Sequence, residues 1–179
     1  MALDLTDVTL TTVPAHSTDH PRLVELINAA FFVYPFMKEP RTSPEGIAEE
    51  LCDGAMFVLA SDSNANVIGC AMVRPVSGVD WGVEPLPEPA NHASGAYLGL
   101  VAVDPAARKG GVGKRLVAAA EDAARALGYH AMLLGTLAEM GNVAYYEAMD
   151  YHTVAAYEFE AGHWGVSIPH NYHIMERLL

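Results

Sequence analysis

The residues from Leu98 to Gly128 constrain the fold of this chain more than any other part of the sequence. An apolar run ends at Asp104-Pro105, a dipeptide that stops a strand and opens a turn. A glycine-rich turn follows, and apolar residues then recur at helical spacing from Val112 to Leu127. Gly128 stands where helices commonly end in a left-handed residue. The stretch therefore predicts a strand, a glycine-rich turn and a helix, in that order.

A turn that enters a helix in this way is suited to binding a phosphate group. The first N–H groups of a helix have no partner within it, and the aligned peptide dipoles place partial positive charge there. Glycines let a phosphate approach the backbone because they have no Cβ atom. Four of the ten lysine and arginine residues also lie here: Arg108, Lys109, Lys114 and Arg115. A phosphate-bearing ligand is therefore favoured over the alternative of a simple tight surface turn.

The turn does not match the two best-known phosphate motifs. The P-loop requires glycine at position 108 and serine or threonine at position 115, where the chain has Arg108 and Arg115. The dinucleotide pattern that would start at Gly111 requires glycine at position 116, where Leu116 stands. The turn does contain Arg-x-x-Gly-x-Gly, formed by Arg108, Gly111 and Gly113, directly after the strand exit. This arrangement resembles the acyl-CoA pyrophosphate loop of the GNAT superfamily of N-acyltransferases.

A second segment, Asn142 to Tyr151, resembles another part of the same superfamily. It contains an aromatic residue, a tyrosine and a glutamate in succession, shortly before the helix exit. The resemblance implies that Tyr146 protonates the departing CoA thiolate and that Asn142 contacts the pantetheine arm. Asp150 stands where the superfamily usually has glycine. Because aspartate tolerates left-handed backbone better than most residues, we expect the helix exit to be kept.

The resemblance implies acetyl-CoA, or another acyl-CoA, as co-substrate and no metal. A main-chain N–H group of the central strand would stabilise the charge that develops on the thioester oxygen. The implied acyl-CoA-binding residues are Val101, Ala102, Val103, Arg108, Lys109, Gly110, Gly111, Val112, Gly113, Lys114, Asn142 and Tyr146. The histidines near the C-terminus have no metal-binding spacing and are expected on the surface or in loops: His163, His170 and His173.

The sequence does not identify the base that deprotonates an acceptor amine. An alkylamine with a pKa near 10.4 is only about 0.1% neutral at pH 7, so a base or a water chain must take a proton. Superfamily members often have glutamate on the central strand, where this chain has Gly99 and Leu100. An acceptor amine of low pKa would also meet the requirement. The candidate bases are Glu139, His92, His163 and Tyr97, and the residues that could border the acceptor are Tyr34, Phe36, Tyr97, Glu139 and His163.

The whole chain predicts the α/β (α+β) class and the GNAT fold, as a single domain over residues 1–179. Periodicity and turn signals give the order β-α-α-β-β-β-α-β-α-β-β, which is the order of the superfamily. This order implies a mixed central sheet of about six or seven strands with about four helices. Ser17 or Asp19 is expected to cap the first helix, and Ser43 the second, which would include Leu51 and Cys52. Residues 74–95 show no periodicity, and so long a loop is usually either functional or disordered.

The composition argues against several function classes. The net charge of -12 disfavours nucleic-acid binding, which needs a basic face. The first ten residues have no basic segment, so no signal peptide is expected, and no apolar run reaches the roughly 20 residues of a membrane span. Cys52 and Cys70 have no metal or redox spacing. We expect a cytoplasmic protein with neither nucleic-acid nor membrane partners, for which a homodimer is one option by analogy.

These features combine into one hypothesis and two alternatives. The hypothesis is an N-acetyltransferase that moves an acetyl or short acyl group from acyl-CoA to a small-molecule or peptide amine, with Tyr146 as general acid. The first alternative is a non-catalytic acyl-CoA-binding sensor or interaction module, which the missing strand carboxylate keeps open. The second is an O-acyltransferase. The acidic remainder of the chain would suit a cationic acceptor, or would simply confer solubility.

Overall fold

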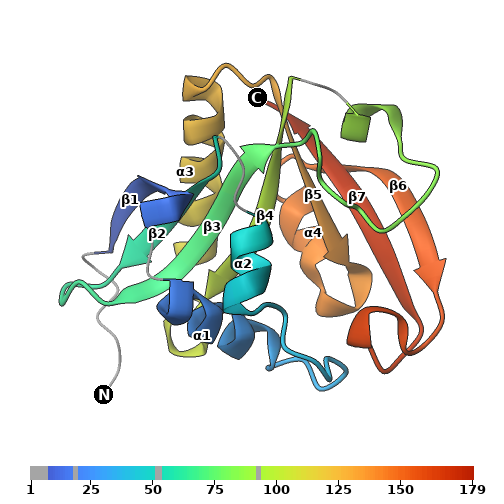
Figure 1. The fold of residues 1–179 in the computed structure, drawn as a ribbon, viewed down its shortest axis with the longest axis horizontal. Coiled ribbons are helices and arrows are strands. Elements are labelled where there is room, and N and C mark those ends of the chain that lie inside the picture. Colours follow the sequence, from blue (N-terminus) through green and yellow to red (C-terminus); the bar gives the residue numbers. More distant parts are fainter. Residues whose placement is uncertain (1–7, 18–19, 51–53, 92–93) are drawn as a thin grey trace. The chain divides into compact units, whose positions relative to one another are not determined.

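The computed structural model describes residues 8–17, 20–50, 54–91 and 94–179. In these residues seven strands and four α-helices follow in the order that the sequence predicts, which confirms the predicted fold class (Figure 1). The elements are β1 (Thr9–Pro14), α1 (His20–Phe31), α2 (Pro44–Glu50), β2 (Met56–Ser61), β3 (Val67–Pro75), β4 (Gly95–Val103), α3 (Val112–Ala126), β5 (Ala131–Leu137), α4 (Asn142–Glu147), β6 (His152–Phe159) and β7 (His170–Leu178). None of the helices described is long and apolar enough to cross a membrane.

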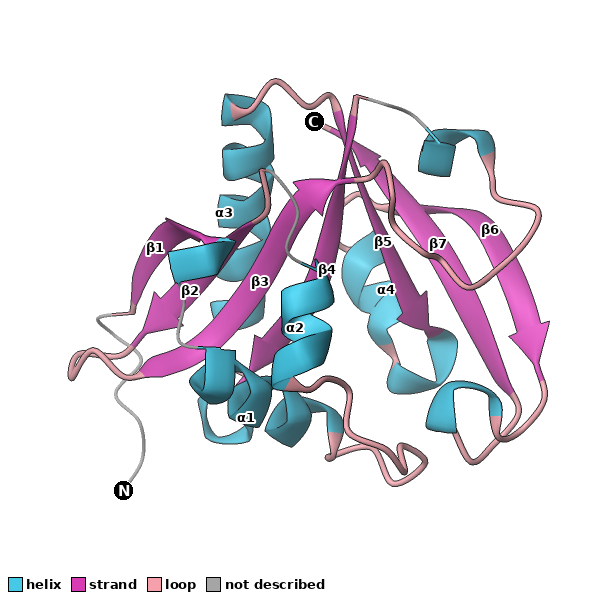
Figure 2. Cartoon of the chain, viewed as in Figure 1, coloured by secondary structure: helices cyan, strands magenta, loops and turns pink. Residues whose placement is uncertain are grey.

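The strands form one mixed sheet in the order β1-β2-β3-β4-β5-β7-β6 (Figure 2). Antiparallel pairing joins β1 to β2, β2 to β3, β5 to β7 and β6 to β7. β4 and β5 are parallel, and their register places Gly95 opposite Ala131 and Tyr97 opposite Leu133. Because parallel neighbours need a crossover connection, the glycine-rich turn and α3 lie between these two strands.

The chain divides into two compact units, and β4 contributes to both. The first unit comprises Met1–Val33, Pro40–Arg74 and Leu98–Ala123, and the second comprises Tyr34–Glu39, Pro75–Tyr97 and Ala124–Leu179. Residues 98–103 of β4 therefore belong to the first unit, and residues 95–97 to the second. The single domain that the sequence suggests stays a prediction.

In the first unit, α3 is packed through one apolar face. Val112, Leu116 and Ala120 recur every four residues, and each is at most 2% exposed. Gly69 of β3 allows the close approach, since a Cβ atom built on it would lie 2.9 Å from Leu116 Cδ1. The packing of α3 on β3 thus depends on a position without a side chain.

Local signals place the remaining helices of the first unit. The Ser43 hydroxyl accepts a hydrogen bond from the Gly46 N–H at 3.0 Å, so the predicted cap of α2 is confirmed. The Asp19 alternative for the cap of α1 lies outside the described residues, as do Leu51 and Cys52. α3 is followed by Gly128 with a φ of 83°, the left-handed residue that the sequence predicts.

In the second unit, the long segment between β3 and β4 is part of the core. Trp81 is 4% exposed, and its ring meets that of Tyr97 edge-on, with 5.2 Å between the centroids. The Tyr157 hydroxyl donates a hydrogen bond to the Pro85 carbonyl at 2.5 Å. The buried members of this cluster are Val76, Trp81, Ala90, Leu133 and Ile174. Residues 76–91 are therefore held by burial of their own apolar side chains, among them Trp81.

Two glycines of the first unit are expected to respond oppositely to alanine. At Gly69 a Cβ atom would lie 2.9 Å from Leu116 Cδ1 and 3.2 Å from the Ala102 carbonyl oxygen. Gly69→Ala should therefore lower the free energy of unfolding by about 1–3 kcal/mol. Gly46 lies inside α2, and a Cβ atom there would meet the flexible hydroxyl of Thr42 at 3.1 Å and that of Ser43 at 3.6 Å. Gly46→Ala should raise stability by up to about 1 kcal/mol, and equal urea-unfolding midpoints for the two variants would contradict this packing.

Candidate functional site

The glycine-rich turn of the first unit presents its backbone N–H groups at the start of α3. The 3-10 turn η3 (Pro105–Ala107) follows Asp104, whose carboxylate accepts a hydrogen bond from the Ala106 N–H at 2.8 Å. Lys109 and Gly111 then take left-handed backbone, with φ of 67° and 77°. When left-handed residues alternate with residues of negative φ, successive backbone N–H groups turn toward one concave side. Together with the N-terminus of α3, the turn has the features of an anion-binding site.

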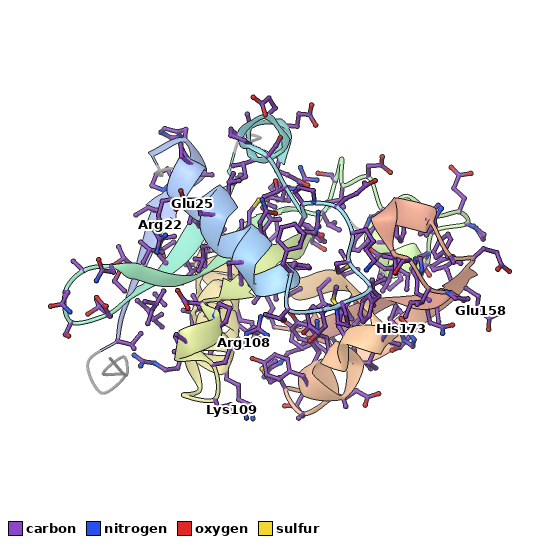
Figure 3. All side chains as sticks on the ribbon, turned by 90° about the horizontal axis from the view of Figure 1, so that it is seen from below. Arg22, Glu25, Arg108, Lys109, Glu158 and His173 are labelled. Carbon is purple, nitrogen blue, oxygen red and sulfur yellow. The ribbon has the colours of Figure 1, made fainter. Side chains whose placement is uncertain are left out.

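The four basic side chains around the turn have different surroundings. Arg108 Nη2 donates to the Ala30 carbonyl near the end of α1 at 2.6 Å. Arg115 Nη2 donates at 2.6 Å to a main-chain carbonyl just before β1. Both guanidinium groups have further N–H donors. Lys109 and Lys114 are exposed, and Figure 3 shows Lys109 extending away from the ribbon of the turn. The two arginines thus anchor the turn, and the two lysines place exposed positive charge beside it.

The central strand β4 is irregular at Leu100. Its φ of 48° lies in the left-handed region, which few residues other than glycine adopt inside a strand. Such a residue interrupts the regular alternation of a strand and redirects the groups that follow it. The buried Cys70 thiol donates to the Leu100 carbonyl at 3.4 Å, and burial raises the pKa of this thiol to about 12. The N–H groups assigned to the thioester oxygen, those of residues 101–103, come directly after the irregularity.

In the second unit, Tyr146 lies on α4 and is 7% exposed. Its ring meets those of Tyr145 and Tyr151, with centroids 5.3 and 5.6 Å away. Burial raises the pKa of its hydroxyl, and the nearby hydroxyls of Tyr145, Tyr97 and Tyr34 raise it further. The phenol therefore stays protonated at neutral pH and can donate to a buried anion.

The exit of α4 matches the sequence expectation. Asp150 takes left-handed backbone with a φ of 66°, so the predicted helix exit is confirmed with aspartate in place of glycine. The Tyr151 N–H donates to the Tyr146 carbonyl at 3.1 Å across this exit. At the other end, Asn142 Nδ2 donates to Thr136 Oγ1 of β5 at 3.3 Å. The Asn142 amide is thereby directed toward β5.

The aromatic loop after α1 is held to the segment between β6 and β7. The Ser167 N–H donates to the Phe36 carbonyl at 2.9 Å, and Met37 forms an isolated bridge with Val166. The rings of Tyr34 and Phe36 are tilted together, with 5.6 Å between their centroids. The two candidate acceptor residues on this loop therefore belong to the second unit, together with Tyr146.

An aromatic cluster forms where β6 ends and β7 begins. The Phe159 ring stacks on His163 at 4.2 Å and 6°, and on His170 at 5.5 Å and 27°. Trp164, which is 43% exposed, lies 4.8 Å from Phe159. His163, a candidate for the base and for the acceptor site, is exposed.

The surface or loop position expected for the three C-terminal histidines is wrong for His170. This residue is the first of β7 and is 2% exposed. The physical reason is strand alternation, since His170, Tyr172 and Ile174 share one face and Ile174 is fully buried. The same alternation is the signal by which the sequence could have identified His170 as a buried polar residue.

Among the residues described, Glu139 and His170 each have one buried polar atom without a hydrogen-bond partner. Glu139 lies on the 3-10 turn η4 (Ala138–Met140), and its Oε1 accepts from the Asn171 N–H at 2.9 Å and from the Asn171 amide at 3.1 Å. His170 Nδ1 lies 3.0 Å from the Ile168 carbonyl oxygen. Within the described part of the chain, neither Glu139 Oε2 nor His170 Nε2 has a hydrogen-bond partner.

The candidate residues divide between the two units. The first unit holds the turn, residues 108–114, and the β4 residues 101–103. The second unit holds the proposed acid, Tyr146, and the predicted pantetheine contact, Asn142. It also holds every described acceptor candidate: Tyr34, Phe36, Tyr97, Glu139 and His163. His92 lies outside the described residues. Across residues 8–17, 20–50, 54–91 and 94–179, no group of three or more His, Cys, Asp or Glu residues could hold a metal ion.

Comparison with solved structures supports this fold. The ribosomal-protein-S18-alanine N-acetyltransferase from Escherichia coli is 16% identical, with a TM-score of 0.70, over 96% of this chain and 94% of that chain. The ribosomal-protein-alanine N-acetyltransferase from Brucella melitensis is 20% identical, with a TM-score of 0.69, over 96% of this chain and 99% of that chain. The protein yncA from Salmonella typhimurium was solved with its cofactor acetyl-CoA. It is 18% identical, with a TM-score of 0.70, over 97% of this chain and 95% of that chain.

The sequence comparisons establish the family. No curated protein matches the chain. Residues 21–151, which are most of the chain, match the model of the acetyltransferase (GNAT) family. The resemblance seen in the sequence is thereby confirmed, and this chain belongs to the acetyltransferase (GNAT) family.

Proposed function

We propose that this protein is an N-acetyltransferase that transfers an acetyl group, or another short acyl group, from acyl-CoA to a primary amine of a small molecule or peptide. The observation that carries the proposal is the turn before α3, with left-handed Lys109 and Gly111 leading into a helix N-terminus. Among structures of similar fold, one was solved with its cofactor acetyl-CoA, and two are named as alanine N-acetyltransferases of a ribosomal protein. The cytoplasmic location and the homodimer stay predictions.

The turn would hold the pyrophosphate of acyl-CoA. The N–H groups of residues 111–113 would donate to its oxygens, because glycines at 111 and 113 leave the backbone accessible. Lys109 and Lys114 would add positive charge that an otherwise acidic chain, with a net charge of -12, concentrates here. Arg108 would contribute mainly by fixing the turn through its bond to Ala30.

The chemical step would use two further groups of this chain. The main-chain N–H groups after the irregularity at Leu100 would stabilise the charge on the thioester oxygen. Tyr146 would donate a proton to the thiolate as the C–S bond breaks. A thiol in water has a pKa near 8.5, so transfer from a phenol of raised pKa is uphill unless the thiolate is also desolvated. Because Tyr146 is buried, a thiolate beside its hydroxyl would also be desolvated.

Replacing the Tyr146 hydroxyl should impair turnover far more than CoA binding. Tyr146→Phe keeps the ring that packs on Tyr145 and Tyr151 and removes only the proton donor. We expect kcat to fall about 10²–10⁴-fold in a thiol-release assay with acetyl-CoA and a panel of amines. Calorimetry should give a Kd for CoA that changes far less than kcat does. The matched control is Tyr145→Phe, a half-buried neighbour on the same helix, which should retain turnover.

The same assay separates the alternative functions. Tight CoA binding without turnover for any amine would favour the sensor, and acylation of alcohols to esters would favour O-acyl transfer. Full activity of Tyr146→Phe would remove this residue from the mechanism while leaving the N-acetyltransferase proposal in place.

Substitution at Gly111 tests the phosphate-binding role of the turn. Its φ of 77° disfavours any side chain by roughly 1–2 kcal/mol, although no atom lies within 4 Å of the Cβ position. We expect Gly111→Val to shift the N–H groups of the turn and to raise the Kd for CoA by about tenfold or more, or ~1.4 kcal/mol. The control is Gly78→Val, at a glycine with a φ of 82° and equally open space. If calorimetry gives the same Kd for CoA in Gly111→Val and in the wild type, the turn does not bind the phosphates of CoA.

A further inference from the structure

We propose that Glu139 and His170 together receive the acceptor amine, and that His170 takes the proton which the amine must lose before it attacks. This inference rests on the proposed N-acyl transfer. It supplies the base that such a reaction needs and that Gly99 and Leu100 of the central strand cannot provide.

The ring of His170 is fixed in one tautomer, with its second nitrogen open. A carbonyl oxygen can only accept a hydrogen bond, so the contact of 3.0 Å with Ile168 places the ring hydrogen on Nδ1. In the neutral ring Nε2 is then an acceptor with a free lone pair. The side chain is 2% exposed, and Nε2 has no partner among the residues described. A buried acceptor left open in this way indicates a missing donor.

Glu139 leaves a second acceptor open beside the same peptide unit. Its Oε1 is held by the N–H and the side-chain amide of Asn171, at 2.9 and 3.1 Å. Because Asn171 follows His170 in the chain, this carboxylate lies against the peptide bond that joins the two residues. Glu139 Oε2 is buried and has no partner in the described ranges. Burial of an unpaired carboxylate oxygen is costly unless a donor, and best a cation, is bound to it.

The two open atoms define the chemistry of the missing group. Both are acceptors, and one belongs to a carboxylate, so the complementary ligand is a positively charged donor. An ammonium group has three N–H donors, which is enough to satisfy both acceptors. Phe159, stacked on His170 with 5.5 Å between the ring centroids, adds an aromatic surface that suits the apolar stem of an amine. A primary alkylamine fits this combination.

The proton transfer is balanced within the proposed reaction. The ammonium directs one N–H to Glu139 Oε2 and another to His170 Nε2. One N–H bond breaks, its proton passes to Nε2, and its electron pair stays on the amine nitrogen. That pair forms the bond to the thioester carbon, the C–S bond breaks with its electrons on sulfur, and Tyr146 gives sulfur a proton. The second proton that nitrogen loses restores the Tyr146 phenol, and the imidazolium releases its proton to solvent.

Paired amines of different basicity distinguish a base from a structural residue. The test uses an alkylamine substrate and its fluorinated analogue, which is mostly neutral at pH 7 because fluorine withdraws electrons from nitrogen. We expect Glu139→Gln and His170→Asn to lower kcat/KM for the alkylamine about 100-fold. For the neutral analogue the loss should stay below about fivefold, since no proton has to be removed first. The Kd for CoA should not change in either variant.

Two matched variants control for the general effect of replacing a glutamate or a histidine on β6 or β7. Glu158 is an exposed carboxylate that faces Asn171 in the strand register, and His173 lies on β7 with its Nδ1 3.1 Å from Thr153 Oγ1 (Figure 3). Glu158→Gln and His173→Asn should keep the wild-type kcat/KM for both amines.

Each outcome decides the proposal. Equal losses for the two amines would show a structural role, and no loss in Glu139→Gln would show that its open oxygen binds no amine; either overturns the proposal. If His170→Asn does not fold, Glu139→Gln decides alone, because the amide keeps the shape of the carboxylate. A wild type that acylates no amine would instead overturn the proposed function, a result that the wild-type assay shows before any variant is made.

Discussion

The parallel pairing of β4 with β5 is the constraint on which the rest of the structure depends. Two parallel neighbours cannot be joined by a hairpin, so the chain must cross over between them, and here α3 is that crossover. The crossover places the N-terminus of α3 after the carboxyl end of β4, with η3 and the glycine-rich turn between them. The unpaired N–H groups of that terminus, with the left-handed residues Lys109 and Gly111 before them, create the anion site. The phosphate-binding turn is thus a consequence of sheet topology combined with glycine in the right places.

Local patterns were sufficient to predict the order of elements and several of their ends. The cap at Ser43, the left-handed Gly128 and the left-handed Asp150 all depend on residues within a few positions of a helix end. Contacts between distant residues could not be predicted in this way. Arg108 bonds to Ala30, 78 residues away, and nothing near Arg108 in the sequence indicates that partner. The burial of Trp81 likewise depends on Leu133 and Ile174, which belong to other strands.

In the candidate site too, some features follow from a short segment of sequence and others depend on contacts between distant residues. Tyr146 was assigned from a short segment, and the structure adds that it is buried among other tyrosine rings. The base could not be assigned from the sequence, because its signal is not a motif. The signal is two buried atoms, Glu139 Oε2 and His170 Nε2, that have no hydrogen-bond partner among the residues described. The position of the Glu139 carboxylate beside the His170–Asn171 peptide depends on how η4 meets β7. Unsatisfied polar atoms of this kind become visible only once the side chains are placed.

The central claim is that the turn before α3 binds the pyrophosphate of acyl-CoA. A crystal structure of the protein with CoA tests it most directly. The account predicts pyrophosphate oxygens about 3 Å from the backbone nitrogens of residues 111–113, at hydrogen-bonding distance. A CoA molecule whose pyrophosphate is bound elsewhere, with these N–H groups in contact only with solvent, would contradict it.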